Sequence, residues 1–126
     1  MSVKFNVVER SRPGDPQAPK KFYPSIVSSG RVTLRQLAEE IASISTVSTA
    51  DTMAMLEALL TVIPNELAEG NIVELGDFGN FWLRSSAEGS DTPDDVHGGQ
   101  ITSILPRFNA GKEFKKVLGA IQYEKA

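Results

Sequence analysis

The chain has 126 residues, of which 40% are hydrophobic, and this is the size and composition of one globular protein with a modest core. It has no cysteine, which excludes disulfides and thiolate chemistry and is typical of a reducing compartment. No apolar run approaches the roughly 18 residues that would span a bilayer, and the start lacks the apolar core of a signal peptide. We therefore expect a cytoplasmic protein without a membrane segment. The formal net charge of -3 excludes a globally basic nucleic-acid binder, so any anion site must be a local patch.

The first 30 residues alternate short β-rich pieces with chain breakers. Phe5 and Val7 suit one strand, and "KKFYPSIV" at 20–27 is a second extended piece. Between them lie Pro13, Gly14, Pro16 and Pro19, which predict a connecting loop because proline fixes φ and lacks an amide donor. Residues 1–31 carry six Lys/Arg and two acids. We therefore predict a basic N-terminal β extension over residues 1–30, joined to a region over 31–126 in one structural unit.

Two helices are predicted next. From Thr33 the apolar residues recur at three- and four-residue steps, and Thr33 with Gln36 has the spacing of a capping box. Ser48 opens a second helix, which Gly70 ends because glycine readily adopts the left-handed conformation. Pro64 lies inside this helix and deletes a backbone hydrogen bond, which predicts a kink or a break. Residues 32–83 carry one basic side chain and eight acids, so this region is acidic.

A tight hairpin is predicted after Gly70, since "IVEL" and "NFWLR" flank "GDFG", whose glycines tolerate positive φ. Residues 85–99 are polar and turn-rich, which predicts a long connection or a flexible arm. "QITSILPRF" reads as a strand, and the rest of the chain as a helix that runs to the end. The order predicts an α+β fold: N-terminal β extension, helical hairpin, three-stranded antiparallel sheet with a β arm, and C-terminal helix.

The triplet Asp77-Phe78-Gly79 is also the magnesium-binding triplet of protein kinases. The glycine-rich phosphate loop, the strand lysine and the HRD-type loop that a kinase needs are missing, and the chain is too short for two lobes. We interpret the triplet as the corner of the hairpin.

His97 is the one histidine, in a hydrophilic loop. The order of Asp91, Asp94 and Asp95 before it does not match a calcium loop, and no GxSxG elbow accompanies it for a hydrolase triad. The sequence therefore predicts no enzyme, no catalytic residue, no metal site, no cofactor and no small-molecule substrate.

A basic group lies near the end of the chain: Arg107, Lys112, Lys115 and Lys116 fall within ten residues. Lys112 and Lys116 are four apart and so lie on one helix surface, with Lys115 beside them. Such a row can neutralise phosphates, and it can equally be an ordinary solvated helix face. The charge pattern leaves both readings open.

The whole arrangement resembles the bacterial histone-like HU and integration host factor family. In that family a glycine after the second helix leads to a V-L-x-x-F-G-x-F hairpin, a β arm, and an F-x-P-G-K-x-L turn that opens a final helix. The matching residues here are Gly70, Val73, Leu75, Phe78, Gly79, Phe81, Phe108, Gly111 and Lys112. The resemblance covers about residues 31–120, and the leading segment resembles a longer variety with an added N-terminal β segment.

The resemblance implies an intertwined homodimer without enzymatic activity, located at the nucleoid in the cytoplasm. Two β arms would embrace the minor groove of duplex DNA and bend it, while lysines of the body hold phosphates with little sequence preference. The DNA-binding residues it implies are Arg84, Arg107, Lys112, Lys115 and Lys116, with Lys20 and Lys21 added from the extension.

The predicted arm departs from the family pattern. The family's arm is rich in Arg and Lys, whereas residues 85–99 contain Glu88, Asp91, Asp94 and Asp95 and no basic side chain. Pro93 stands where a tip proline would, between these acids. This motivates an alternative: an HU-derived dimeric protein-interaction module that has lost DNA binding and whose arm recruits a basic protein surface.

Overall fold

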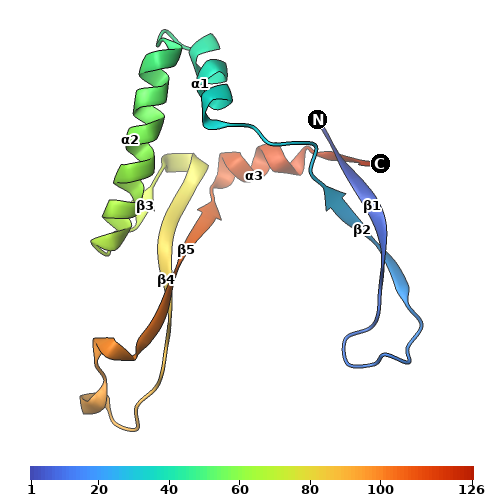
Figure 1. Cartoon of the computed structure of the whole chain (residues 1–126), viewed down its shortest axis with the longest axis vertical. Helices are drawn as coiled ribbons and strands as arrows, with labels where there is room; N and C mark the ends of the chain where they lie inside the picture. Colours follow the sequence, from blue (N-terminus) through green and yellow to red (C-terminus); the bar gives the residue numbers. More distant parts are fainter. The chain divides into compact units, whose positions relative to one another are not determined.

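The computed structural model describes all of residues 1–126 (Figure 1). Its contacts divide the chain into two compact units. The terminal unit comprises Met1–Thr33 with Val117–Ala126, and the central unit comprises Leu34–Lys116. The predicted division into domains at residues 1–30 and 31–126 stays a prediction. In the structure, the last segment of the chain, Val117–Ala126, belongs to the same unit as the first. None of the helices combines the length and the apolar composition that a membrane span requires.

The terminal unit is a three-stranded sheet in the order β2-β1-β6. Strands β1 (Ser2–Arg10) and β2 (Lys21–Val27) pair antiparallel, which confirms the predicted β extension. Strand β6 (Gln122–Lys125) lies parallel to β1 on its other side. Besides Glu9 and Lys125, the register gives one sheet face these apolar and aromatic side chains: Val3, Phe5, Val7, Phe22, Pro24, Ile26 and Tyr123.

Strand β6 corrects the prediction that the final helix runs to the end of the chain. Helix α3 covers only Lys112–Gly119. Glycine is a poor helix former, so a helix end at Gly119 is favourable. The backbone groups of the residues that follow can form hydrogen bonds with the unpaired edge of β1. The Gln122 N–H donates to the Met1 carbonyl oxygen at 3.0 Å, and the Ala126 N–H donates to that of Phe5 at 2.9 Å. Pairing across the whole length of the chain therefore overrides local helical periodicity.

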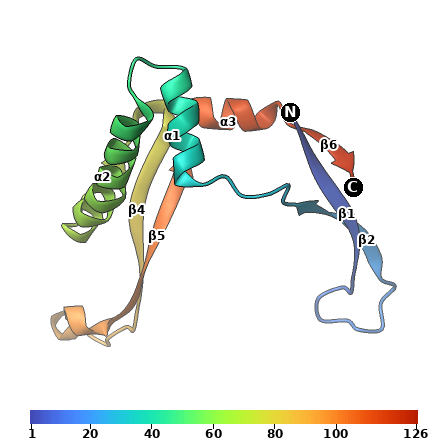
Figure 2. The same ribbon diagram turned by 45° about the horizontal axis from the view of Figure 1, so that its top comes forward.

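The central unit begins with the predicted helical hairpin of α1 (Leu34–Ser43) and α2 (Thr49–Ala68), which lie side by side (Figure 2). The Ser48 hydroxyl caps α2 by accepting the Asp51 N–H at 3.1 Å. At the other end Gly70 has φ +88°, and its N–H donates to the Leu67 carbonyl oxygen at 2.9 Å. Both predicted ends of the second helix are confirmed.

Of the kink or break predicted at Pro64, the break is wrong, because α2 is continuous through that residue. The kink stays a prediction. Proline removes one hydrogen bond to the preceding turn, but the helix is 20 residues long and capped at both ends. The bonds of the neighbouring turns are enough to carry the helix across the gap.

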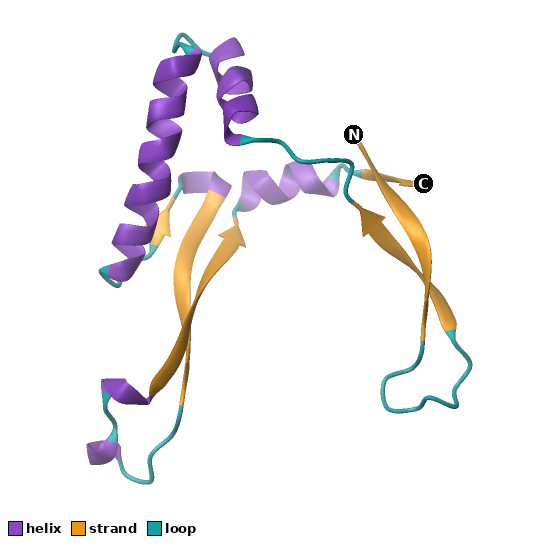
Figure 3. Ribbon diagram, in the orientation of Figure 1, coloured by secondary structure: helices purple, strands orange, loops and turns teal.

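The rest of the central unit is an antiparallel sheet in the order β3-β4-β5. Its strands are β3 (Val73–Glu74), β4 (Gly79–Ala87) and β5 (Ile101–Ala110), and a 3-10 turn at Gly76–Phe78 joins the first two. Strands β4 and β5 pair as far as Ala87 and Ile101, and two further 3-10 turns, Pro93–Asp95 and Gly98–Gln100, lie beyond the ladder (Figure 3). This ribbon, with its tip over residues 88–100, is the predicted arm.

Candidate nucleic-acid interface

The "GDFG" corner positions the end of β5 and the start of α3. Gly79 has φ +145°, and a Cβ at this position would overlap the Asn109 carbonyl oxygen. A Cβ on Gly111 would likewise overlap the Asp77 carbonyl oxygen. Glycine is required at both positions because two backbone segments approach too closely for any side chain. The triplet Asp77-Phe78-Gly79 is therefore the tightly packed corner of the hairpin, as predicted.

Four phenylalanines lock this junction. The Phe78 ring centroid lies 5.5 Å from that of Phe108 and 5.0 Å from that of Phe114, and the Phe81 and Phe108 centroids are 4.9 Å apart. Tilted and edge-to-face rings at such distances contribute about 0.5–1.5 kcal/mol each beyond area burial. Because Phe114 belongs to α3, the cluster holds one face of that helix and leaves the opposite face to solvent.

That opposite face carries three lysines: Lys112, Lys115 and Lys116. All three are exposed, and at 100° per residue they fall within one third of the helix circumference. The Lys115 N–H donates to the Gly111 carbonyl oxygen at 3.0 Å, so the helix starts at the glycine turn. The structure thus brings these three predicted residues together as one surface, which we call the α3 lysine face.

Arg84 and Arg107 share one face of the central sheet. Arg107 in β5 is paired with Trp82 in β4, and Arg84 is two residues further along β4, so the two arginines are diagonal neighbours. The same face carries Asn80 and Asn109, whereas the other face carries Phe81, Leu83, Pro106 and Phe108. The only acid that the register puts on the arginine face is Glu74.

Lys20 and Lys21 belong to the other unit. Lys21 begins β2, and Lys20 ends the loop before it. Arg10 is paired with Lys21 across the ladder, and Arg12 lies close by in the loop. Neither arginine was predicted as a site residue. The only signal in the sequence was the excess of Lys and Arg in residues 1–31.

The arm tip is acidic in structure as in sequence. Glu88, Asp91, Asp94 and Asp95 are all exposed, and Pro93 opens a 3-10 turn rather than projecting alone from a basic tip. The Thr92 hydroxyl donates to the Asp95 carboxylate at 2.8 Å. The backbone N–H of His97 donates to the Gln100 side chain at 2.7 Å. No three His, Asp or Glu side chains converge closely enough to hold a metal ion.

Comparison with known proteins identifies a family and structural relatives that include the two described below. The model of the HU-HIG family, described as an HU domain fused to wHTH, Ig, or a glycine-rich motif, matches residues 1–125. No curated protein matches the chain.

Both structural relatives share the fold. A candidate bacterial DNA-binding protein from Bacteroides vulgatus ATCC 8482 superposes with a TM-score of 0.67 at 12% identity, covering 98% of this chain and 47% of its own. This chain therefore spans about half the length of that protein. HU from Anabaena, crystallised with DNA, superposes with a TM-score of 0.56 at 24% identity over 71% of this chain and 99% of its own. On the family match over nearly its whole length, and with the predicted HU-like α+β fold confirmed, the chain belongs to the HU-HIG family of HU-like proteins.

Proposed function

We propose that this chain is a non-enzymatic, nucleoid-associated protein that binds duplex DNA through its phosphates with little sequence preference and bends it. The observation that carries the proposal is the α3 lysine face, where three ammonium groups gather on one side of a helix whose other side is packed. Each cation that neutralises a phosphate releases a counterion, which supplies affinity without reading any base. Arg84 and Arg107, neighbours on one sheet face, are two further cations of the same unit.

The binding form is a homodimer, because the single chain leaves its helices without a core. Only Ala38 and Leu67 are buried among the hydrophobic residues. On α2, Met55, Leu59 and Leu60 remain 55%, 40% and 60% exposed. Full burial of such side chains contributes about 1.5–3 kcal/mol each, so covering them with the helices of a second copy supplies much of the missing stability.

Trp82 offers a second argument for a partner subunit. Its indole Nε1–H is buried and has no hydrogen-bond acceptor within the chain. A buried donor left without an acceptor costs about 1–3 kcal/mol. An acceptor from a second copy would remove this cost, and Trp82 is the only tryptophan available to report on it by fluorescence.

A salt titration of duplex binding tests the proposal, with the mass of the protein measured in parallel. If Arg107 and the α3 lysine face make four phosphate contacts per subunit, the slope of log K against log salt should be about -7 for the dimer. A slope near zero, or no duplex binding at low salt, would refute DNA binding. A monomeric mass would refute the shared core.

A second candidate function rests on the acidic arm. Its four exposed carboxylates would be repelled by phosphates, and they suit a basic protein surface. In this case the chain is a dimeric interaction module. A gel shift with random-sequence duplex, run beside a pull-down, separates the two functions. A protein partner that is still captured after deletion of residues 88–99 would count against the arm as its binding site.

A further inference from the structure

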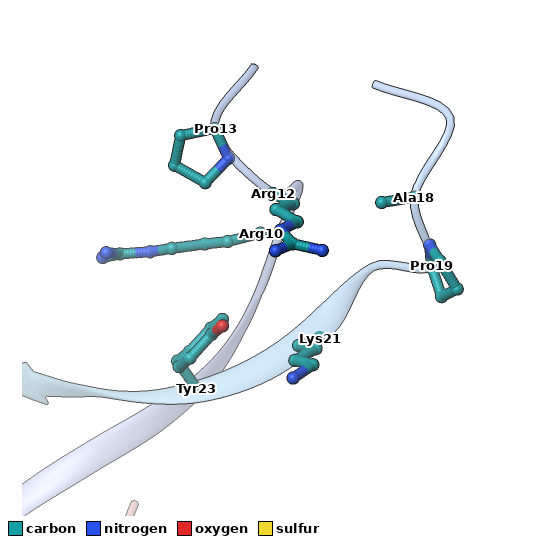
Figure 4. A pocket seen from close by; sticks show the side chains of 7 residues that line it. All are labelled: Arg10, Arg12, Pro13, Ala18, Pro19, Lys21 and Tyr23. Atoms are coloured by element: carbon teal, nitrogen blue, oxygen red, sulfur yellow. The ribbon is translucent and has the colours of Figure 1, made fainter. Parts of the chain in front are cut away.

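The terminal unit has a cationic hollow at the loop end of the β1–β2 hairpin. Its volume is about 350 Å³, and its lining is shown in Figure 4. The lining residues are Arg10, Arg12, Pro13, Ala18, Pro19, Lys21 and Tyr23. Three cations, one phenol and no carboxylate therefore surround one small space.

The strand register explains why two of these cations lie on one sheet face. Arg10 is directly opposite Lys21, so their side chains project from the same sheet face, and Tyr23 lies two residues further along β2 on that face. Glu9, the nearest acid on β1, is paired with Phe22 and so projects from the other face. Alternation in the two strands thus separates the basic side chains from the acid.

Asp15, the one acid of the loop, is hydrogen-bonded within the loop. The Asp15 carboxylate accepts the Gln17 N–H at 3.1 Å, and the Asp15 N–H donates to the Arg12 carbonyl oxygen at 3.2 Å. The one ion pair of the chain joins Arg35 and Glu39, so none of the three cations of the hollow is neutralised. Prolines at 13, 16 and 19 restrict the loop in the free chain, which reduces the entropy lost on binding.

We infer that this hollow binds a backbone phosphate of nucleic acid, and that the β1–β2 hairpin is a second DNA-contacting arm. Guanidinium groups donate in a fork that matches phosphate oxygens, and Lys21 adds a point charge. The rings of Tyr23 and the two lining prolines provide an apolar rim for the adjoining sugar. The assignment rests on the proposed DNA binding, and it gives the basic-arm role to the hairpin in place of the acidic tip at residues 88–100.

Anisotropy of a labelled duplex with the full chain tests the assignment. Arg10→Gln, Arg12→Gln and Lys21→Gln together should weaken binding at low salt by at least about tenfold, since hydrogen bonds to charged groups are lost. The slope of log K against log salt should become less steep by about 0.9 per chain for each phosphate released. A matched control, Lys4→Gln with Arg31→Gln and Lys125→Gln, removes equal charge from the same unit outside the hollow. Screening should limit its effect to less than about threefold.

A second pair of variants distinguishes loss of phosphate binding from misfolding of the triple variant. Ala18 lines the hollow, so Ala18→Glu adds a carboxylate there while Ala18→Gln adds the same bulk without charge. The assignment requires weak binding by the first and near-normal binding by the second.

Each remaining outcome refutes a distinct claim. If the unaltered chain does not bind duplex, the proposed function itself fails. If it binds and the hollow variants match the control, the phosphate site alone is overturned. If the triple variant lowers self-association at low salt without changing duplex affinity, the hollow instead receives the acidic arm of a second copy, which also overturns the inference.

Discussion

The backbone N–H of Gly111 donates to the carbonyl oxygen of Phe78 across 2.8 Å, and this bond ties the start of α3 to the corner between β3 and β4. Any side chain on Gly111 would press against the Asp77 backbone, which cannot rotate away as a flexible side chain would. The orientation of the α3 lysine face therefore depends on a glycine that contacts no ligand.

Gly111→Ala should lower the free energy of unfolding by about 1–3 kcal/mol, because overpacking forces the backbone to move. Urea denaturation at fixed protein concentration measures this change. Gly89→Ala is the control, since a Cβ there meets nothing within 4 Å, and its effect should stay within about 0.5 kcal/mol. Equal losses in both variants would show that the close approach is not what requires glycine.

Reversing the α3 lysine face should abolish duplex binding without unfolding the protein. Lys112→Glu, Lys115→Glu and Lys116→Glu turn three exposed cations into anions, so attraction to phosphate becomes repulsion. Gel shift and circular dichroism check affinity and fold. The charge-preserving triple Lys→Arg variant at the same positions should still bind, and retained binding by the glutamate variant would remove this face from the interface.

Neutralising the arm should strengthen DNA binding. Replacing Glu88 with Gln and Asp91, Asp94 and Asp95 with Asn removes four anions per chain. A unit charge about 10 Å from a phosphate is worth about 0.4 kcal/mol in water, so affinity should rise roughly threefold to tenfold at low salt. Anisotropy at two salt concentrations measures this. Unchanged affinity would place the arm away from DNA, as the interaction-module alternative requires.

Leu60→Asp should dissociate the dimer, because Leu60 is exposed in the single chain and would bring a charge into the shared core. Analytical ultracentrifugation gives the mass, and Trp82 emission should shift as its surroundings become wet. Asn65→Asp adds the same charge to the same helix at an exposed polar position. Dissociation by both variants, or by neither, would contradict an interface through the apolar side of α2.

Ser48→Ala should lower the free energy of unfolding by about 1 kcal/mol, since the Asp51 N–H would lose its acceptor. Thr46→Ala, in the same connection between α1 and α2, should change it by less than about 0.5 kcal/mol because no hydrogen bond of the Thr46 side chain is lost. Thermal unfolding at equal concentration compares the two. Matching losses would mean that the hydroxyl does not act as a cap.

Local signals predicted much of this fold correctly. Ser48 and Gly70 marked the ends of α2 because caps act through backbone groups only a few residues away. The glycines of the "GDFG" corner marked a tight turn for the same reason, and the prolines before Lys20 marked the loop between β1 and β2. In each case the determining interaction lies within the segment that carries the signal.

Non-local contacts decided the rest. Residues 122–125 form a strand because the edge of β1, more than 100 residues away in sequence, offers unpaired backbone groups. The hollow at Arg10, Arg12 and Lys21 likewise exists only once β1 and β2 pair in one particular register. Periodicity reports which face of an element is apolar, but a strand edge or a cluster of charges depends on which segments meet, and that is settled by pairing and packing across the whole chain.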